Sequence, residues 1–120
     1  LLVVAALGGR LDQTLGNLSL LTSPDLEAID VQLDDGSERI FIIRSHLDFA
    51  CEPGEIVSLV PWGSTVSGIT TTGLQYPLED ETLYPHQTRG ISNVSIGSQV
   101  SIQIETGLLI CLHSRGQETI

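Results

Sequence analysis

The sequence predicts a mainly β protein, in which an antiparallel β-sandwich or barrel follows the last strand-helix unit of an α/β domain. Two patterns predict this class. An apolar run at 1–7 precedes two glycines and a stretch with leucines at helical spacing. From residue 26 onward, apolar and polar residues alternate and turn signals recur at short intervals. We therefore place a domain boundary near Pro24 and Asp25, between an α/β remnant at 1–25 and an all-β domain at 26–120.

The first segment is typical of one strand, a turn and a helix. Residues 1–7 are apolar throughout, as in a strand of a parallel sheet that is covered on both faces. The helical stripe ends at Ser23 and Pro24 and consists of the leucines at 11, 15, 18 and 21. Parallel strands come in sets joined by crossover helices, yet no second unit of this kind follows. We expect the chain to begin inside an α/β domain, and the absence of methionine agrees with a fragment of a longer protein.

The remainder predicts short strands between turn signals such as Asp35-Gly36 and Pro53-Gly54. Strict alternation at 29–34 and 99–105 is typical of strands that are buried on one face. The expected strands are 28–34, 38–44, 46–52, 55–61, 65–72, 74–78, 91–95, 98–105 and 107–113. Their core consists of Ile, Leu and Val, because aromatic residues make up only 4% of the chain.

Composition argues against several classes of protein. The net charge is -10, with five arginines and no lysine, so the basic surface that nucleic acid requires is lacking. This charge favours small cationic ligands, although acidity also serves solubility. No apolar run reaches the length of a membrane span, and 1–7 lacks the basic leader of a signal peptide. We expect a cytoplasmic protein with neither a nucleic-acid nor a membrane partner.

The isolated reactive side chains do not form a recognisable catalytic or metal motif. The two cysteines lack metal-ligand spacing and are expected as buried free thiols, and the three histidines as surface or edge residues. The acidic run at 79–81 is more typical of a solvated turn than of a metal site. The cysteines and histidines are Cys51, Cys111, His46, His86 and His113.

Polar residues at the end of the first strand give the first functional hypothesis. Ligands of α/β sheets bind beyond the carboxyl ends of the strands, where Gly8, Gly9, Arg10 and Asp12 lie. Glycines allow close backbone approach, a helix N-terminus and Arg10 favour phosphate, and Asp12 suits a metal or an electrostatic anchor. The alternative is a tight turn, a solvated Arg10 and an Asp12 that favours the first helical turn.

A second candidate site follows the threonine-rich strand at 65–72. Tyr76 could stack on a flat ring while nearby hydroxyls bond the edge of that ring, and Ser92 and Asn93 add polar groups. The alternatives are ordinary strand threonines at 70–72 and a Tyr76 that packs into the core near a turn.

Four segments together resemble the C-terminal half of thiamine pyrophosphokinase. They are GGRLDQTLGNLSLL at the start, TTTGLQYPLEDETL in the middle, GISN after it and IETGLLICLH near the end. Each segment alone is weak evidence for the family, but the occurrence of all four in this order and at this spacing is specific to it. The resemblance implies that 1–25 is the remnant of a catalytic α/β domain and that 26–120 is an all-β thiamine-binding domain.

The resemblance implies transfer of pyrophosphate from ATP to the hydroxyl of thiamine, giving thiamine diphosphate and AMP with Mg²⁺. Asp12 would hold magnesium or orient the hydroxyl, and Arg10 with the Gly8-Gly9 backbone would lie near the phosphates. Gln13 stands where many bacterial members have histidine. Tyr76 takes the place of the family's stacking aromatic residue. The positions that match the polar residues around the thiamine pyrimidine are Thr70, Thr72, Ser92 and Asn93.

The acidic motifs of the family's N-terminal domain have no counterpart in this chain. We therefore expect the parent protein to be an enzyme and the 120-residue chain alone to be inactive. The resemblance also implies a homodimer, with thiamine between the catalytic domain of one subunit and the β domain of the other. The rival hypotheses are a non-catalytic module that binds thiamine or dimerises, and a purely structural β domain.

Overall fold

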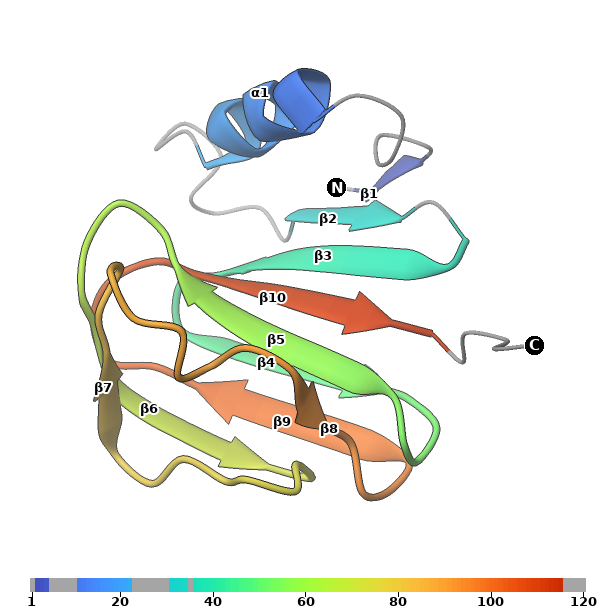
Figure 1. Ribbon diagram of the computed structural model, residues 1–120, viewed down its shortest axis with the longest axis vertical. Coiled ribbons are helices and arrows are strands. Elements are labelled where there is room, and N and C mark those ends of the chain that lie inside the picture. Colours follow the sequence, from blue (N-terminus) through green and yellow to red (C-terminus); the bar gives the residue numbers. More distant parts are fainter. Residues whose placement is uncertain (1, 5–10, 23–30, 35, 116–120) are drawn as a thin grey trace.

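The computed structural model describes residues 2–4, 11–22, 31–34 and 36–115, which form one helix and ten strands (Figure 1). Apart from the helix α1, the described residues form short strands linked by turns, as the alternation and turn signals predict. The elements in chain order are β1 (Leu2–Val4), α1 (Leu11–Leu21), β2 (Val31–Asp34), β3 (Glu38–Ile43), β4 (His46–Ala50), β5 (Ile56–Pro61), β6 (Val66–Thr72), β7 (Glu81–Leu83), β8 (Asn93–Val94), β9 (Gln99–Gln103) and β10 (Leu109–Ser114).

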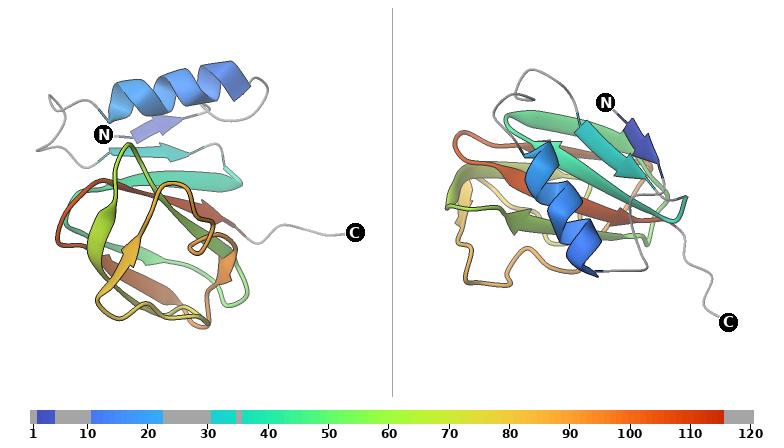
Figure 2. Two further views of the ribbon diagram at one scale, coloured as in Figure 1. Left: turned by 60° about the vertical axis from the view of Figure 1, so that its left-hand side comes forward. Right: turned by 90° about the horizontal axis from the view of Figure 1, so that it is seen from above.

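The strands form two stacked sheets rather than a closed barrel (Figures 1 and 2). The six-stranded sheet has the order β1-β2-β3-β10-β5-β8, and the four-stranded sheet has the order β4-β9-β6-β7. β1 runs parallel to β2, whereas the other paired strands are antiparallel. The predicted β-sandwich is thus confirmed. The parallel neighbour of the first strand is β2, which comes from the all-β part of the sequence.

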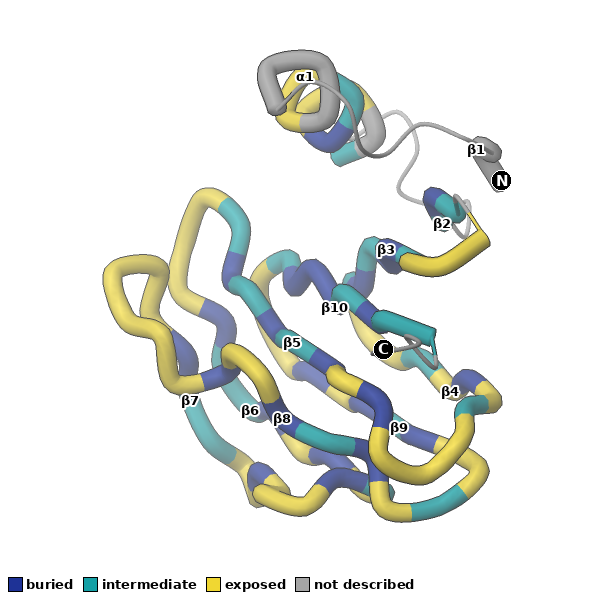
Figure 3. The backbone as a smooth tube through the Cα atoms, turned by 45° about the vertical axis from the view of Figure 1, so that its right-hand side comes forward, coloured by how far each residue is buried: buried dark blue, intermediate teal, exposed yellow. Residues whose placement is uncertain are grey.

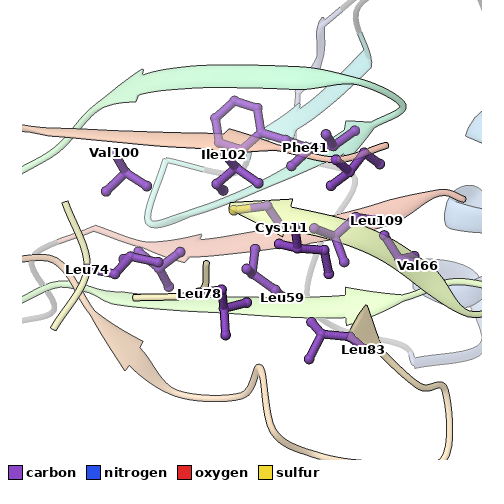
Figure 4. Close-up of a cluster of buried hydrophobic side chains, with 14 of the residues drawn as sticks. Phe41, Leu59, Val66, Leu74, Leu78, Leu83, Val100, Ile102, Leu109 and Cys111 are labelled. Carbon is purple, nitrogen blue, oxygen red and sulfur yellow. The ribbon is translucent and has the colours of Figure 1, made fainter. Parts of the chain in front are cut away.

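The space between the sheets holds the main apolar core (Figures 3 and 4). Alternate residues of the central strands point into it: β10 contributes Leu109 and Cys111 from one sheet, and β9 contributes Val100 and Ile102 from the other. The ring of Phe41 in β3 stacks on that of Phe49 in β4, with 5.1 Å between the ring centroids. Burying these apolar side chains is the main force that holds the two layers together.

The outer face of the six-stranded sheet is also covered. Leu18 of α1 is buried against Leu33, Ile40 and Ile110, which come from β2, β3 and β10. Figure 2 shows the helix lying over this face. Because the central strands are covered on both sides, β10 carries buried residues at consecutive positions instead of strict alternation. Within the described residues, α1 and β1 therefore share a sheet and a core with the β domain.

Most expected elements are present. The helix begins at Leu11 and ends at Leu21 as the leucine stripe predicts, and eight of the nine expected strand ranges contain a strand. The strand expected at 74–78 is wrong: only an isolated bridge forms there, between Leu74 and Ser95. Gly73 at a φ of 89° turns the chain away, and Pro77 has no N–H for a ladder, so β7 pairs with β6 instead. Among the described residues, no helix is long and apolar enough to cross a membrane.

The prediction of buried free thiols is confirmed for Cys111 and only in part for Cys51, and one of the histidine predictions is wrong. Cys111 is buried, Cys51 is half-buried, and both are free thiols. His46 and His86 are exposed as expected. His113 is 1% exposed, because it continues the inward-facing row of β10 and finds polar partners there. A sequence pattern alone did not reveal those partners, which lie more than 50 residues away in the chain.

Candidate functional site

The segment that follows β6 runs beside β8 and the residues after it, and backbone hydrogen bonds join the two segments. The N–H of Gln75 donates to the carbonyl of Val94 at 2.8 Å, and the N–H of Ile96 donates to the carbonyl of Gly73 at 3.0 Å. Gly73 has the positive φ that this turn requires. These bonds bring Tyr76 beside Asn93, so the fold unites two of the positions that the sequence singled out.

Asn93 bonds directly to the backbone of Tyr76. Its Oδ1 accepts the N–H of Tyr76 at 3.1 Å, and its Nδ2 donates to the carbonyl of Tyr76 at 2.8 Å. The same Oδ1 accepts the N–H of Val94 at 2.9 Å. Asn93 is 9% exposed, so these bonds are largely shielded from water. The side chain therefore acts as a clamp on residue 76.

The two threonines that precede the turn hold the other end of the same segment. Thr71 donates its N–H to the carbonyl of Leu78 and accepts the N–H of Leu78 on its Oγ1, both at 2.9 Å. The Oγ1 of Thr70 accepts the N–H of Asp80 at 3.1 Å. Asp80 has a φ of 51°, an uncommon conformation for a residue with a side chain. The hydroxyls of this strand thus fix the course of the loop at 76–80.

A cavity of about 190 Å³ opens beside Tyr76. Tyr76 is 62% exposed, so its ring is available to a ligand rather than packed into the core. An apolar lining with one aromatic ring and a few polar groups is the usual composition of a site for a flat heterocycle. The lining residues are Leu59, Tyr76, Pro77, Leu78, Arg89, Gly90, Ile91 and Asn93.

The far side of the cavity is formed by the loop at 84–92. The N–H of Leu59 donates to the carbonyl of Gly90 at 2.8 Å, and this close approach leaves no room for a side chain at position 90. Arg89 forms an ion pair with Glu81, and both groups remain partly exposed. The acidic run at 79–81 therefore contributes a partner for the cation that lines the cavity. Such an exposed pair contributes little to stability, so a ligand that displaced Glu81 from the arginine would lose little by doing so.

The structure brings some of the sequence-predicted site residues together and separates others. Tyr76 and Asn93 line the cavity, and Ser92 adjoins it in the chain. Ser92 is exposed and adopts a φ of 62°, and its N–H donates to the Oγ of Ser58 at 2.9 Å. Thr70 and Thr72 do not line the cavity. They alternate with the buried Thr71 and so lie on the exposed face of the four-stranded sheet.

The predicted phosphate and metal site falls mostly outside the described residues. Gly8, Gly9 and Arg10 are not among the described residues. Asp12 is the second residue of α1. Sequence reasoning did not single out Leu59, Arg89 or Ile91, which also line the cavity. Arg89 directly precedes the GISN segment, and this position is the one local signal that could have identified it.

A second cavity, of about 300 Å³, lies where β3 begins and where β4 and β10 end. Its charged side chains are already bonded to one another. Glu55 accepts the Nε2–H of His113 at 2.7 Å, and Arg39 donates to the Nδ1 of that ring at 3.0 and 3.2 Å. These donors require an unprotonated Nδ1, so the imidazole is neutral. Burial lowers the pKa of His113, in agreement with that state.

Two further groups around this second cavity, Arg115 and Cys51, are also poorly suited to hold a ligand. Arg115 forms a two-fold ion pair with Asp34 at 2.5 and 2.7 Å, which holds the pKa of that carboxyl well below its usual range. Burial raises the pKa of the Cys51 thiol, so it is a poor nucleophile. Within the described part of the chain, every buried side-chain nitrogen and oxygen has a partner. The cavity beside Tyr76, with its exposed ring, is therefore the better candidate for a ligand site.

The residues that the structure describes contain no group of three or more His, Cys, Asp or Glu side chains that could hold a metal ion. The described residues therefore do not fit a magnesium site by themselves. A magnesium site would need further side chains, and Asp12 is the candidate that the sequence offers.

Comparison with known families assigns the region that carries this cavity. A family model described as thiamin pyrophosphokinase, vitamin B1 binding domain, matches residues 42–109. The chain is 30% identical over 110 residues to the thiamine pyrophosphokinase of Bacillus subtilis strain 168, covering 89% of this chain and 51% of that protein. It is also 30% identical over 115 residues to thiamine pyrophosphokinase 1 of Oryza sativa subsp. japonica, covering 91% and 42%. The chain thus spans about half the length of the curated relatives it matches.

Solved structures show the same fold. The crystal structure of thiamine pyrophosphokinase from Bacillus subtilis superimposes with a TM-score of 0.85 at 28% identity, covering 97% of this chain and 55% of that one. The thiamin pyrophosphokinase of Candida albicans superimposes with a TM-score of 0.75 at 18% identity, covering 94% and 43%. At that lower identity the likeness is one of fold alone.

Proposed function

We propose that the cavity beside Tyr76 binds thiamine. The premise is that the chain belongs to the thiamin pyrophosphokinase family and carries its vitamin B1 binding domain. The observation that carries the proposal is the exposed ring of Tyr76 over an apolar cavity inside the matched range 42–109. The face of this ring would stack on one ring of thiamine. The hydroxyl of Ser92, which is exposed and adjoins the cavity-lining Ile91 and Asn93 in the chain, would bond the edge of the ligand.

The charge of the chain supports a cationic ligand. The net charge is -10. Arg89, the charged residue that lines the cavity, is balanced by its ion pair with Glu81, so the support comes from the charge of the chain as a whole. A negative field raises the local concentration of cations such as the thiazolium of thiamine. The proposal assigns no ligand contact to Thr70, whose hydroxyl already accepts the N–H of Asp80.

The whole protein is proposed to be a thiamine pyrophosphokinase, which transfers pyrophosphate from ATP to thiamine and releases AMP. In this reaction the described part of the chain binds and orients thiamine, and catalysis by such positioning is typical of phosphoryl transfer. Arg10, Asp12 and the Gly8-Gly9 backbone would serve the phosphates and a magnesium ion. Support for the enzyme comes from the names of the relatives that match about 90% of this chain. A homodimer, with thiamine between the domains of two subunits, is part of the same proposal.

The alternative is a non-catalytic module that binds thiamine, and it is favoured by the restriction of the family match to 42–109. Calorimetric titration of the 120-residue chain with thiamine tests the site, and thiamine-dependent formation of AMP from ATP tests the enzyme. We expect the full-length protein to bind thiamine and form AMP, and the 120-residue chain to form none. AMP formation by the purified 120-residue chain would contradict the assignment of catalysis to the preceding domain. Absence of thiamine binding by both proteins would contradict the site.

A further inference from the structure

We propose that Asn93 is a positioning residue for Tyr76 and not a ligand of thiamine, an inference that rests on the proposed function of the cavity. A carboxamide has four hydrogen-bonding positions, two on oxygen and two on nitrogen. Asn93 uses three of them on the backbone of its neighbours: it accepts the N–H groups of Tyr76 and Val94 and donates to the carbonyl of Tyr76. The oxygen of this side chain is therefore fully committed to the protein, and so is one of the two N–H groups on its nitrogen.

The exposed ring of Tyr76 explains why such a clamp is needed. A buried ring is oriented by the side chains packed around it, whereas the side of Tyr76 that faces solvent has none. The position from which this ring projects therefore depends on how its own backbone is held. Tyr76 is 62% exposed, while Asn93 beneath it is 9% exposed. A stacking platform that is fixed before the ligand arrives loses less conformational entropy on binding.

The clamp is one end of a two-point attachment. On the other side of Pro77, the backbone of Leu78 is held by Thr71 through two hydrogen bonds of 2.9 Å. Pro77 itself restricts the backbone between the two points because its ring fixes φ. Residues 76–78 thus form a short strap that is fastened at both ends, with the ring of Tyr76 projecting from it.

The chemistry of the clamp explains why the residue is asparagine. Holding both the N–H and the C=O of one residue requires an acceptor and a donor on the same short side chain. Aspartate keeps the acceptor but replaces the donor by a second oxygen, which would face the carbonyl of Tyr76. Alanine removes both. Asn93→Asp therefore breaks the bond to the Tyr76 carbonyl and keeps those from the N–H groups, whereas Asn93→Ala breaks all three.

A double-mutant cycle in the full-length protein tests the inference, with thiamine affinity measured by calorimetry. We expect Asn93→Ala to weaken thiamine about tenfold and Tyr76→Ala about ten- to a hundredfold. In the Tyr76→Ala background, Asn93→Ala should change the affinity by less than about twofold, because the clamp then has no ring to orient. Single effects that multiply in the double variant would show that Asn93 contacts thiamine independently and would overturn the proposal.

Gln75→Ala is the matched control, because Gln75 is the exposed neighbour of Tyr76 and bonds through its backbone N–H to Val94. It should leave the affinity for thiamine unchanged. Should Asn93→Ala fail to fold, Asn93→Asp replaces it in the cycle, with the same non-additivity expected.

Exchange of the Tyr76 amide hydrogen, measured without thiamine, provides a readout that does not depend on the proposed function. We expect this hydrogen to exchange faster in Asn93→Ala than in the unaltered protein. An unchanged rate would overturn the clamp even if thiamine binds. If the unaltered protein fails to bind thiamine while the exchange rate rises as expected, the proposed function fails and the clamp stands.

Discussion

Replacing His113 by leucine removes a buried imidazole that joins two charged side chains. The ring is 1% exposed and donates its Nε2–H to the carboxylate of Glu55 at 2.7 Å. Its Nδ1 accepts from Arg39, and 4.9 Å separate its ring centroid from that of Phe49. Leucine fills much of the same volume without polar atoms, so His113→Leu separates the loss of hydrogen bonds from the opening of a cavity.

The expected cost follows from what each partner loses. Glu55 is 6% exposed and would keep the bond from the N–H of Glu52 but lose the one from the imidazole. A hydrogen bond to a charged group contributes about 1.5–3 kcal/mol. The guanidinium of Arg39 lines the open cavity, so water replaces part of its lost bond. We therefore expect His113→Leu to lower the free energy of unfolding by about 3 kcal/mol, a shift of about 1–3 M in the urea midpoint.

Urea unfolding of the 120-residue chain, followed by the fluorescence of its single tryptophan Trp62, measures this cost. His86→Leu is the matched control, since His86 is exposed, and it should change the free energy by less than about 0.5 kcal/mol. Combining Glu55→Leu with His113→Leu should cost less than the sum of the two, because neither partner is then left unpaired. A His113→Leu midpoint within the error of the His86→Leu control would refute the network as a source of stability.

Three further predictions concern pH, a turn and the candidate site. Burial lowers the pKa of His113 below its ordinary 6.5, so its contribution to stability is full above that pH and is lost as the pH drops through the folded-state pKa. The urea midpoint should therefore fall on acidification below pH 6.5. It should fall less in His113→Leu. Gly73→Ala should cost about 1–3 kcal/mol by thermal unfolding, because φ is 89° and an added Cβ would collide with the Gln99 carbonyl, whereas Gly97→Ala, with open space and no positive φ, should be neutral. Tyr76→Ala should change stability by less than about 1 kcal/mol while weakening thiamine, since the ring is 62% exposed; a loss of about 3 kcal/mol or more with unchanged affinity would make Tyr76 a core residue.

The fold class could be predicted from the sequence because the periodicity of apolar residues is a local signal. Alternation at 99–105 gives β9, in which Val100 and Ile102 are fully buried, and the leucine stripe gives α1. The strand expected at 74–78 fails for a reason that periodicity does not encode. A backbone at positive φ and a proline without an N–H turn the chain, and the ladder of β6 is taken by β7.

Partners far apart in the sequence escaped prediction for a different reason. A histidine in an apolar strand gives no sign of whether it reaches solvent or a buried carboxylate. His113 pairs with Glu55, which follows a Pro-Gly turn 58 residues earlier, and with Arg39, 74 residues earlier. Only the pairing of β10 with both β3 and β5 brings these three residues together. Polar contacts of this kind depend on strand order, which the pattern of each strand does not specify.

The candidate site shows the same limit at the level of single side chains. Threonine, serine and asparagine bond a ligand or a backbone equally well, so the motif at 70–76 and the GISN segment indicate a site without assigning roles. Burial and hydrogen bonding assign them: the hydroxyl of Thr70 and the amide of Asn93 are bonded to backbone groups, whereas the ring of Tyr76 is open to solvent. The polar residues nearest to an exposed aromatic ring can thus matter for binding by fixing that ring. It follows that Asn93→Ala tests a contact between Asn93 and the ligand only when the same substitution is also made in the Tyr76→Ala variant.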